Sequence, residues 1–268
     1  MLRSGKEHLE TLRDGRVVYI GGERVDDVTT HPAFRNAAGT VAALYDMKAD
    51  PAHHAAMTYV EDGERHSAYW LRPRSREDLA LRFSCHRRIA DFTFGLFGRS
   101  PDRVASDITG LAMSADALTP PCGHPETMRA YYRHARDNDI YAVYAVVPPQ
   151  AARNPEFYQR KNLPVPTLQV VAEDDRGVTV TGMKMLATGA VFANEIWIGN
   201  LIPLAPNQLA ESITCAVPCN AQGLTLWSRK PFERDAKVEF ENPLAYRFDE
   251  TDSMVMCENV KVPWEKVF

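Results

Sequence analysis

Residues 140–149 read IYAVYAVVPP, and at this point the hydrophobic pattern of the chain changes from helical to extended. The run is rich in β-branched and aromatic residues, which favour strands. Pro148 and Pro149 end it, because proline has no N–H to donate to a neighbouring strand. Apolar residues recur at helical spacing before this stretch, and short strands follow one another after it. This order predicts an α+β fold, with a helical N-terminal domain over residues 1–138 and a middle β-barrel domain over residues 139–268.

Three helices are expected in the N-terminal part. The first follows Pro32, which suits the first turn of a helix, and apolar residues within 34–45 repeat at helical spacing. The second begins at Ser75 with a capping box and should end in the break at residues 98–101. Its apolar residues, expected to form one buried face, are Leu79, Phe83, Ala90, Phe94 and Phe97. The third helix should run over residues 125–138.

Short strands are expected after residue 139. Residues 167–184, TLQVVAEDDRGVTVTGMK, predict a hairpin whose turn contains Gly177. Further strands are expected in EIWIGNLI (195–202), SITCAVP (212–218), GLTLWSR (223–229) and SMVMCENVKV (253–262). The chain stops where a strand runs into a linker-like segment, so we expect a fragment of a longer protein in which a helical bundle follows.

Composition argues against several classes of protein. The 268 residues are 45% hydrophobic and 25% charged, which is typical of a globular protein and not of a disordered one. The net charge of -4, without a cluster of basic residues, argues against nucleic acid as the main partner. No apolar run is long enough to span a membrane, and the charged N-terminus does not resemble a signal peptide. Five unevenly spaced cysteines do not form a disulfide framework, so we expect a cytoplasmic protein.

Motifs for several common chemistries are missing from the sequence. Pairs such as Cys215 and Cys219 lack the four-ligand spacing of a zinc site, so we expect no metal centre. The sequence has no G-x-S-x-G, P-loop or GxGxxG motif, which argues against a serine hydrolase, a nucleotide hydrolase and a Rossmann enzyme.

The segment FGLFGRSPDR, residues 94–103, is the strongest candidate for a functional site. Gly98 and Arg99 could end a helix, with the glycine as its cap and the arginine on its last carbonyls. Alternatively, Arg99 and Arg103 form a pair of guanidinium groups at the rim of an aromatic-lined cavity, where they would bind a carboxylate or a phenolate. The residues alone leave both interpretations open.

Two later segments are weaker candidates. Alternation along the strand that ends at Pro148 places Tyr144 and Ala145 on opposite faces, and Arg153 in the following loop could hold a phosphate. Thr188 follows another strand, among small residues. Each pattern is also that of a structural strand with a surface loop.

Five segments, taken in order and spacing, resemble the family of the large (oxygenase) component of 4-hydroxyphenylacetate 3-monooxygenase. They are THPAFRNAAGTVAALYDM (30–47), FGLFGRSPDR (94–103), YAVYAVVPP (141–149), KMLATGA (184–190) and RFDETDSMVMCENVKVPWEKVF (247–268). The resemblance implies an acyl-CoA-dehydrogenase-like fold of helical domain, β-barrel and C-terminal bundle, the last of which this chain lacks. It also implies a homo-tetramer that takes FAD as FADH2 from a separate flavin reductase. The reaction would be hydroxylation of a small phenolic aromatic substrate ortho to its hydroxyl, through a C4a-hydroperoxyflavin.

The resemblance also implies roles for single residues. Arg99 matches the arginine that hydrogen-bonds the phenolic oxygen, and Arg103 and Tyr144 replace the family's usual tyrosine and histidine. These three are the expected catalytic residues, and the two replacements favour a phenol that also carries an anionic group. The implied substrate-binding residues are Arg99, Ser100, Arg103, Tyr144, Asn200 and Leu201. The implied FAD-binding residues are Tyr144, Ala145, Val146, Pro149, Gln150, Ala151, Arg153 and Thr188.

Other functions stay open at this point. A flavin-dependent acyl-CoA dehydrogenase or dehydratase would share the fold, and a non-catalytic β-rich binding module is also compatible with it. A dehydratase needs an iron–sulfur cluster with several cysteine ligands, and only Cys85 and Cys122 lie in the corresponding region. Flavin binding would separate the enzymes from the binding module.

Overall fold

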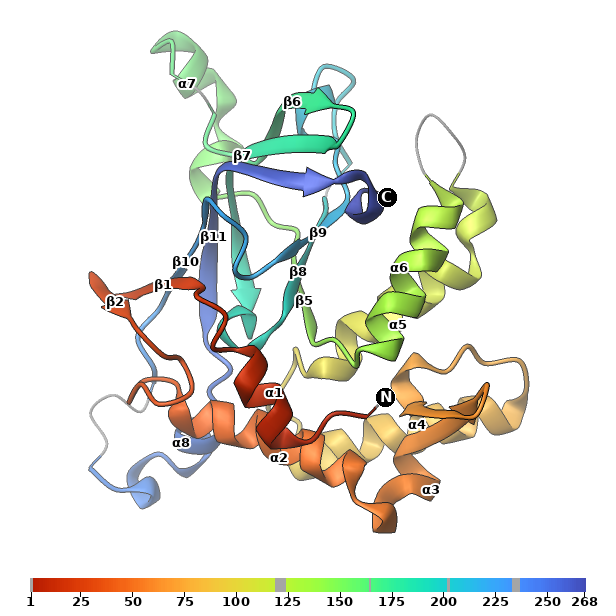
Figure 1. Cartoon of the computed structure of the whole chain (residues 1–268). Coiled ribbons are helices and arrows are strands. Elements are labelled where there is room, and N and C mark those ends of the chain that lie inside the picture. The colour runs from red at the N-terminus through yellow and green to blue at the C-terminus, as the bar shows by residue number, and fades with distance from the viewer. Residues whose placement is uncertain (1, 119–123, 164, 202, 233–236) are drawn as a thin grey trace.

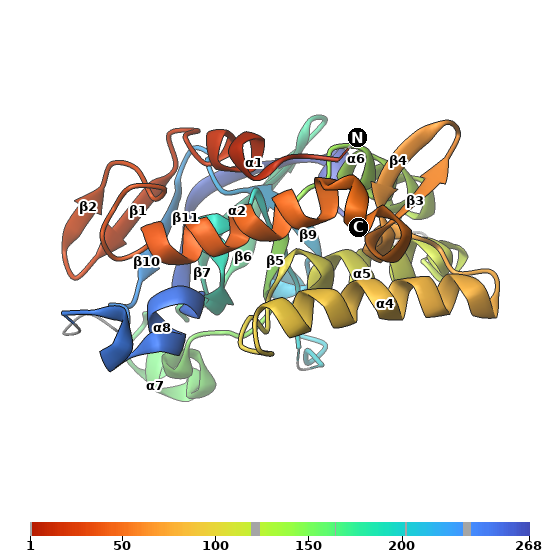
Figure 2. The same cartoon turned by 90° about the horizontal axis from the view of Figure 1, so that it is seen from below.

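The computed structural model describes residues 2–118, 124–163, 165–201, 203–232 and 237–268, and it confirms the α+β class (Figure 1). The helices of the N-terminal part are α1 (Gly5–Thr11), α2 (Arg35–Ala49), α3 (His54–Met57), α4 (Arg76–Phe92), α5 (Pro101–Met113) and α6 (Pro125–Asp137). Two short helices follow, α7 (Pro155–Arg160) and α8 (Pro243–Phe248). Helices α2 and α4 lie along one end of the molecule, below the strands (Figures 1 and 2).

The first expected helix and the start of the second behave as their sequences predict. In α2 the residues that repeat at helical spacing are buried, including Ala38, Val41 and Tyr45. Ser75 caps α4 as expected: its Oγ accepts the Asp78 N–H at 3.1 Å, and the Asp78 carboxylate accepts the Ser75 N–H at 3.1 Å. These two bonds satisfy backbone donors that the first turn of a helix leaves free.

The predicted buried face of the second helix is wrong. Leu79 and Phe83 are exposed, and the residues of α4 that are buried are Cys85 and Ile89. The helix ends at Phe92, so the later phenylalanines of the predicted stripe lie outside it and do not continue its spacing. The predicted stripe joined residues of α4 with residues of the loop that follows it. The helix is therefore shorter than the stripe suggested.

The strands form three sheets. The larger one has the order β2-β1-β10-β11-β7-β6, the smaller one β5-β8-β9, and β3 pairs with β4 as a separate hairpin. Their bounds are β1 Val17–Ile20, β2 Glu23–Val25, β3 Thr58–Glu61, β4 Glu64–Ser67, β5 Ala142–Ala145 and β6 Gln169–Asp174. The others are β7 Gly177–Thr188, β8 Glu195–Ile198, β9 Cys215–Pro218, β10 Leu224–Ser228 and β11 Asp252–Pro263. Every strand predicted after residue 139 is therefore confirmed, including the hairpin of β6 and β7.

A closed β-barrel, in contrast, does not form among the described residues. The two larger sheets meet only through isolated bridges, Val147 with Met185 and Cys215 with Val267. A single bridge at each place does not make a continuous ladder, so the strands of the two sheets do not close into one barrel. The prediction of strands was right, and the prediction of how they close was wrong.

The sheet also includes strands from the N-terminal part. Strand β1 pairs with β10 in parallel, and β2 pairs with β1 through a turn at Gly21 and Gly22. Both glycines have positive φ, which suits a two-residue hairpin turn. This hairpin was not predicted, although the glycine pair between VVYI and ERV is a signal for it. The proposed boundary at residue 139 stays a prediction, and hydrogen bonds of the larger sheet cross it.

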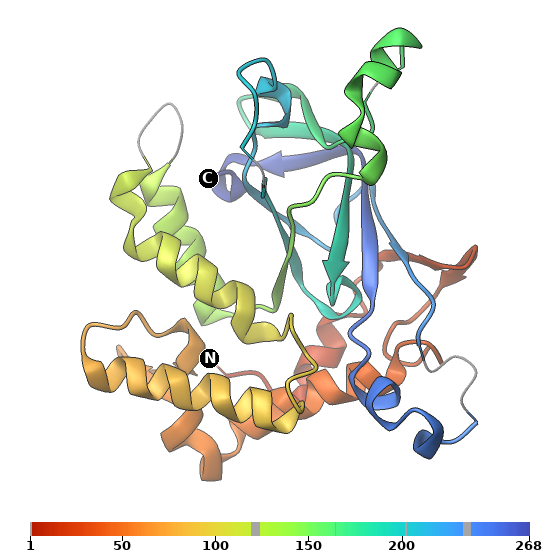
Figure 3. The ribbon, with the colours of Figure 1, turned by 180° about the vertical axis from the view of Figure 1, so that it is seen from behind.

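The helical part and the sheets meet beside the loop that joins α4 to α5. Helix α5 packs against β5, and the loop lies near the ends of β7 and β11 (Figure 3). The Arg99 carbonyl in this loop lies 3.6 Å from the position that a Cβ on Gly189 would take. The loop of the strongest candidate segment thus lies against the loop that follows Thr188.

Candidate functional site

Arg99, Arg103 and Tyr144 come together in the structure. Tyr144 lies on β5, and its ring centroid is 4.7 Å from the Arg99 guanidinium carbon and 5.8 Å from that of Arg103. Arg103 is in the first turn of α5, and Arg99 lies in the loop before that helix. Both distances are within the range of a cation–π contact. The three expected catalytic residues therefore form one cluster, although they come from separate elements.

Arg99 is not the end of a helix. Helix α4 ends at Phe92 and α5 begins at Pro101, so the helix-cap interpretation of Arg99 is wrong. Its Nη1 donates to the Gly98 carbonyl at 2.8 Å, while its Nε is buried and has no hydrogen-bond partner. A buried guanidinium N–H without a partner is costly, and an anionic ligand would satisfy it.

Arg103 already has an acidic partner. Its Nη1 lies 2.6 Å from an Asp107 carboxylate oxygen, one turn further along α5, and this hydrogen bond raises the pKa of Arg103. Both side chains are nearly half exposed. The charge of Arg103 is thus partly balanced, whereas Arg99 keeps a free donor.

Ser100 faces the protein interior. Its Oγ donates to Asp102 Oδ1 at 2.5 Å, and the other Asp102 oxygen contacts His86 Nδ1 at 2.5 Å. These bonds join α4 to the start of α5. The hydroxyl expected to bind substrate is therefore engaged within the protein.

Thr188 and Arg99 line the same cavity, which has a volume of about 450 Å³. Glu250 and Asp252 lie in its wall as well. Thr188 ends β7, and its Oγ1 donates to Asp252 Oδ1 at 2.5 Å. This bond fixes the rotamer of the threonine and leaves its oxygen able to accept a hydrogen bond.

The expected substrate loop lines a second cavity, of about 490 Å³. Val146, Asn200 and Leu201 contribute to its wall, and Leu201 is largely exposed. Asn200 is fixed by Lys184, whose Nζ donates to Asn200 Oδ1 at 2.8 Å. Burial lowers the pKa of Lys184. Of the expected substrate residues, Arg99 thus lines the first cavity, and Asn200 and Leu201 line the second.

The backbone expected to contact the flavin already makes bonds within the chain. The Ala145 carbonyl accepts the Gly199 N–H at 3.4 Å, and the Val146 carbonyl accepts the Leu201 N–H at 3.2 Å. Each carbonyl keeps one lone pair for a ligand. The next segment contains the other expected FAD-binding residues Pro149, Gln150, Ala151 and Arg153. Residues 150–153 form a single 3-10 turn. The Arg153 side chain lies outside the part of the structure that is described.

Three residues with a structural role at the site were not predicted. Lys184 lies in β7 at the parity of the buried Val178 and Val180, and a lysine on an apolar face is a signal that could have revealed it. Glu250 and Asp252 belong to the acidic run DETD, residues 249–252, whose last residue begins β11. An acidic run usually marks a solvated surface, so nothing in the pattern alone distinguishes these two.

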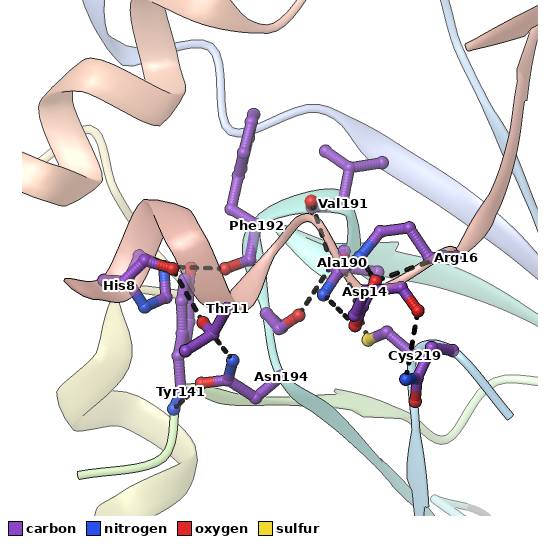
Figure 4. A network of polar contacts seen from close by, with 12 residues as sticks. His8, Thr11, Asp14, Arg16, Tyr141, Ala190, Val191, Phe192, Asn194 and Cys219 are labelled. Carbon is purple, nitrogen blue, oxygen red and sulfur yellow. Dashed lines mark hydrogen bonds and ion pairs between the residues drawn. The ribbon is translucent and has the colours of Figure 1, made fainter. Parts of the chain in front are cut away.

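A network of polar contacts fixes the loop behind Thr188 (Figure 4). Arg16 donates to the carbonyls of Val191 and Ala193 at 3.1 and 2.8 Å, and it pairs with Asp14 at 2.8 Å. Asn194 accepts the Tyr141 N–H at 3.0 Å and the Arg3 Nη1–H at 2.9 Å, and it donates to Thr11 at 2.8 Å. The N-terminal segment is thereby bound to the loop that follows β7.

Two other kinds of feature are absent from the described part of the chain. No three His, Cys, Asp or Glu side chains gather there as ligands for a metal ion. None of the helices described has the length and apolar character needed to cross a bilayer. Cys122, the second candidate cluster ligand, lies outside the described residues.

Comparison with known proteins places this chain in a family. The family model described as "4-hydroxyphenylacetate 3-hydroxylase N terminal" matches residues 4–268. The 4-hydroxyphenylacetate 3-monooxygenase oxygenase component of Thermus thermophilus is 35% identical over 271 residues, covering 100% of this chain and 55% of that protein. The oxygenase component of 4-nitrophenol 2-monooxygenase from a Rhodococcus species is 36% identical, covering 99% of this chain and 51% of that protein. The chain thus spans about half the length of the curated relatives it matches.

Solved structures agree with this assignment. A crystal structure of the oxygenase component of 4-hydroxyphenylacetate 3-monooxygenase, complexed with FAD and 4-hydroxyphenylacetate, superposes with a TM-score of 0.89 at 34% identity. It covers 99% of this chain and 55% of the other. An archaeal 4-hydroxybutyryl-CoA dehydratase has a TM-score of 0.84 at 22% identity over 100% of this chain and 54% of the other, which shows a shared fold alone. The resemblance seen in the sequence is confirmed: this chain belongs to the 4-hydroxyphenylacetate 3-hydroxylase family and corresponds to its N-terminal part.

Proposed function

We propose that this chain belongs to the oxygenase component of a two-component aromatic hydroxylase, which uses reduced FAD to hydroxylate a phenol ortho to its hydroxyl. Family membership supports the reaction class. The single observation in this chain that carries the proposal is the buried Arg99 Nε without a partner, beside the Tyr144 ring. A phenolic oxygen is a ligand that this donor can bind.

The proposed role of Arg99 is to bind the phenol as its phenolate. A cation beside the hydroxyl favours the charged form and so lowers the pKa of the phenol. The phenolate is the more nucleophilic form, and its ring carbon ortho to the oxygen is the proposed site of hydroxylation. Arg99 would therefore both orient the ring and activate it electrostatically.

The residues near Thr188 fit a flavin. Gly189 has φ +78°, and a Cβ there would lie 2.8 Å from the Tyr141 hydroxyl, so the backbone approaches its neighbours closely at this point. The Thr188 oxygen can still accept a hydrogen bond. We propose that Thr188 and the segments 144–146 and 149–153 hold the flavin. Reduced FAD would supply the activation of oxygen, and the protein would exclude water from the reacting atoms.

The proposed substrate is a small phenol that also carries an anionic group. The Arg103 guanidinium contacts the same Tyr144 ring as the Arg99 guanidinium. Its ion pair with Asp107 is exposed, and such pairs exchange partners at little cost. An anionic substituent could therefore displace Asp107 from Arg103 while Arg99 binds the phenolic oxygen.

Several properties of the whole protein are part of the same proposal. A separate flavin reductase would supply reduced FAD, the oxygenase would assemble as a homo-tetramer, and it would act in the cytoplasm. The names of relatives support the first of these, since one is an FADH(2)-dependent monooxygenase and others are oxygenase components.

The test uses the protein that carries this chain, together with a flavin reductase and NADH. We expect hydroxylation of a phenol only when the reductase is present, and tighter binding of reduced than of oxidised FAD. Hydroxylation with NADH and no reductase would contradict the two-component proposal. Absence of any flavin binding would favour the non-catalytic binding module instead.

A further inference from the structure

The Gly98–Arg99 peptide is held by two side chains of the β-rich part, the partly buried Glu250 and the buried Tyr141. The N–H groups of Gly98 and Arg99 donate to the two oxygens of Glu250, at 3.0 and 2.9 Å. The Arg99 carbonyl accepts the Tyr141 hydroxyl at 2.6 Å. Glu250 lies 151 residues away from Arg99 in the sequence, so this contact is made only in the folded chain.

Glu250 is in turn fixed to the loop after Thr188. The Gly189 N–H donates to the carbonyls of Glu250 and Thr251, both at 3.0 Å. Thr251 has φ +50°, an uncommon conformation for a residue with a branched side chain. One short segment therefore fastens the loop that carries Arg99 to the loop that carries Thr188.

We propose that Glu250 is a positioning residue for Arg99: its carboxylate, by accepting both N–H groups, sets the guanidinium for ligand binding. This inference rests on the function proposed above and assigns a residue for which the sequence predicted no role. The second oxygen is essential to it, because a group with only one acceptor leaves one of the two N–H groups without a partner.

The protonation state of Glu250 should then affect how firmly the Arg99 peptide is held. Burial raises the pKa of Glu250 to about 7, against the lowering effect of the N–H groups of Arg99 and Gly98 and of the Arg99 charge. The charge of Asp252 raises it further. When Glu250 takes up a proton it loses an acceptor for one N–H, so the hold on Arg99 should weaken as the pH falls through about 7.

The other charged groups that face Glu250 are Arg99, Arg229, Asp249 and Asp252, all in the wall of the same cavity. Arg229 and Asp249 line the same cavity and pair with each other at 2.5 Å. Burial raises the pKa of Tyr141 well above its usual value, so its hydroxyl remains a donor to the Arg99 carbonyl. A phenol with an ordinary pKa of about 10 also keeps its proton in solution near neutral pH.

The experiment measures the dissociation constant of such a phenol and of FAD for the whole protein and its variants, each across the pH range around 7. In E250Q we expect phenol binding to weaken roughly tenfold to a hundredfold above pH 7, as for loss of one hydrogen bond to a charged acceptor. The step in the pH profile near 7 should disappear in the same variant, which leaves only the gradual strengthening with pH that comes from loss of the phenol's own proton on binding. In E250D, which keeps both oxygens, part of the affinity and the pH dependence should return.

Two controls are available on the same strand region. Glu258 is exposed in β11, and E258Q should leave phenol binding and its pH profile unchanged. Asp252 fastens Thr188 and not Arg99, so D252N should weaken FAD binding more than phenol binding. Substitution of Glu250 should thus affect mainly phenol binding, and substitution of Asp252 mainly FAD binding.

The outcomes distinguish this inference from the proposed function. If the wild-type protein binds neither phenol nor FAD, the proposed function fails. If it binds phenol, but its affinity does not change around pH 7 or E250Q binds equally well, the role of Glu250 is refuted and the function stands. If E250Q does not fold, the wild-type pH profile and E250D decide by the same criteria.

Discussion

Two loops meet at the candidate site, and they are held in different ways. The loop over residues 189–194 is fixed from behind by the network of Figure 4, in which Arg16 and Asn194 make several bonds each. The loop over residues 93–100 is held at its end by Glu250 and Tyr141, and it carries a buried donor without a partner. The difference teaches that the loop over residues 189–194 makes its hydrogen bonds within the protein, whereas the loop over residues 93–100 keeps a donor for which we propose a ligand as the partner.

The largest effect is expected from breaking the support of the first loop. Arg16→Met should lower the free energy of unfolding by about 4 kcal/mol, because two buried carbonyls and the Asp14 carboxylate lose their donor. Chemical denaturation measures this. Arg13→Met is the control, since it removes surface ion pairs with Glu10 and Asp27 and should destabilise the protein much less than Arg16→Met. Equal losses in the two variants would mean that Arg16 does not support the loop.

In the loop over residues 93–100, a substitution should lower activity and leave stability nearly unchanged. Arg99→Ala should cost about 3 kcal/mol in kcat/KM for phenol hydroxylation, as for loss of one preorganised donor, with little change in the free energy of unfolding. Arg99→Lys should restore only part of the rate, because the planar fork is lost. A variant that unfolds more easily but hydroxylates normally would assign Arg99 to structure instead.

The pH dependence of folding stability tests the loop over residues 189–194 further. His8 is buried under the first loop, and burial, helped by the charges of Arg3 and Lys48, lowers its pKa to about 3. The unfolded chain takes up a proton near its ordinary pKa of about 6.5, while the folded chain does not, so folding stability is lost as the pH falls below that value.

Between pH 6.5 and 5 this single residue should remove about 2 kcal/mol of stability. His8→Gln, which cannot titrate, should flatten that part of the curve whatever its effect on stability at pH 8. Denaturation midpoints of the wild type and the variant at a series of pH values measure the slope. Parallel curves would show that His8 is not kept neutral in the folded protein.

The smallest effect concerns the choice of substrate. Arg103→Gln should lower kcat/KM by about 1 kcal/mol for phenols with an acidic substituent and leave neutral phenols unaffected, because the Arg103 charge is exposed and shared with Asp107. A panel of matched acidic and neutral phenols tests it. Equal loss in both groups, or no loss, would contradict an anion site at Arg103.

The strands after residue 139 and the start of α4 could be predicted because they depend on neighbours in the sequence. Alternation of side chains identified β6 and β7, and a serine followed three residues later by an acid identified the cap at Ser75. The prediction failed for the face of α4 and for the closure of the sheets. Which face of a helix is buried, and which strand edges meet, depends on partners elsewhere in the chain.

For the site the same division holds. The sequence by itself determined the segments that carry Arg99, Tyr144 and Thr188, since their motifs are local and specific to a family. Only the tertiary structure decided that Arg99 has a donor left free, that Arg103 is paired, and that Glu250 holds the Arg99 peptide. The physical reason is that a hydrogen bond needs two groups within about 3 Å of each other, and residues far apart in the sequence meet at that distance only after packing has placed their loops.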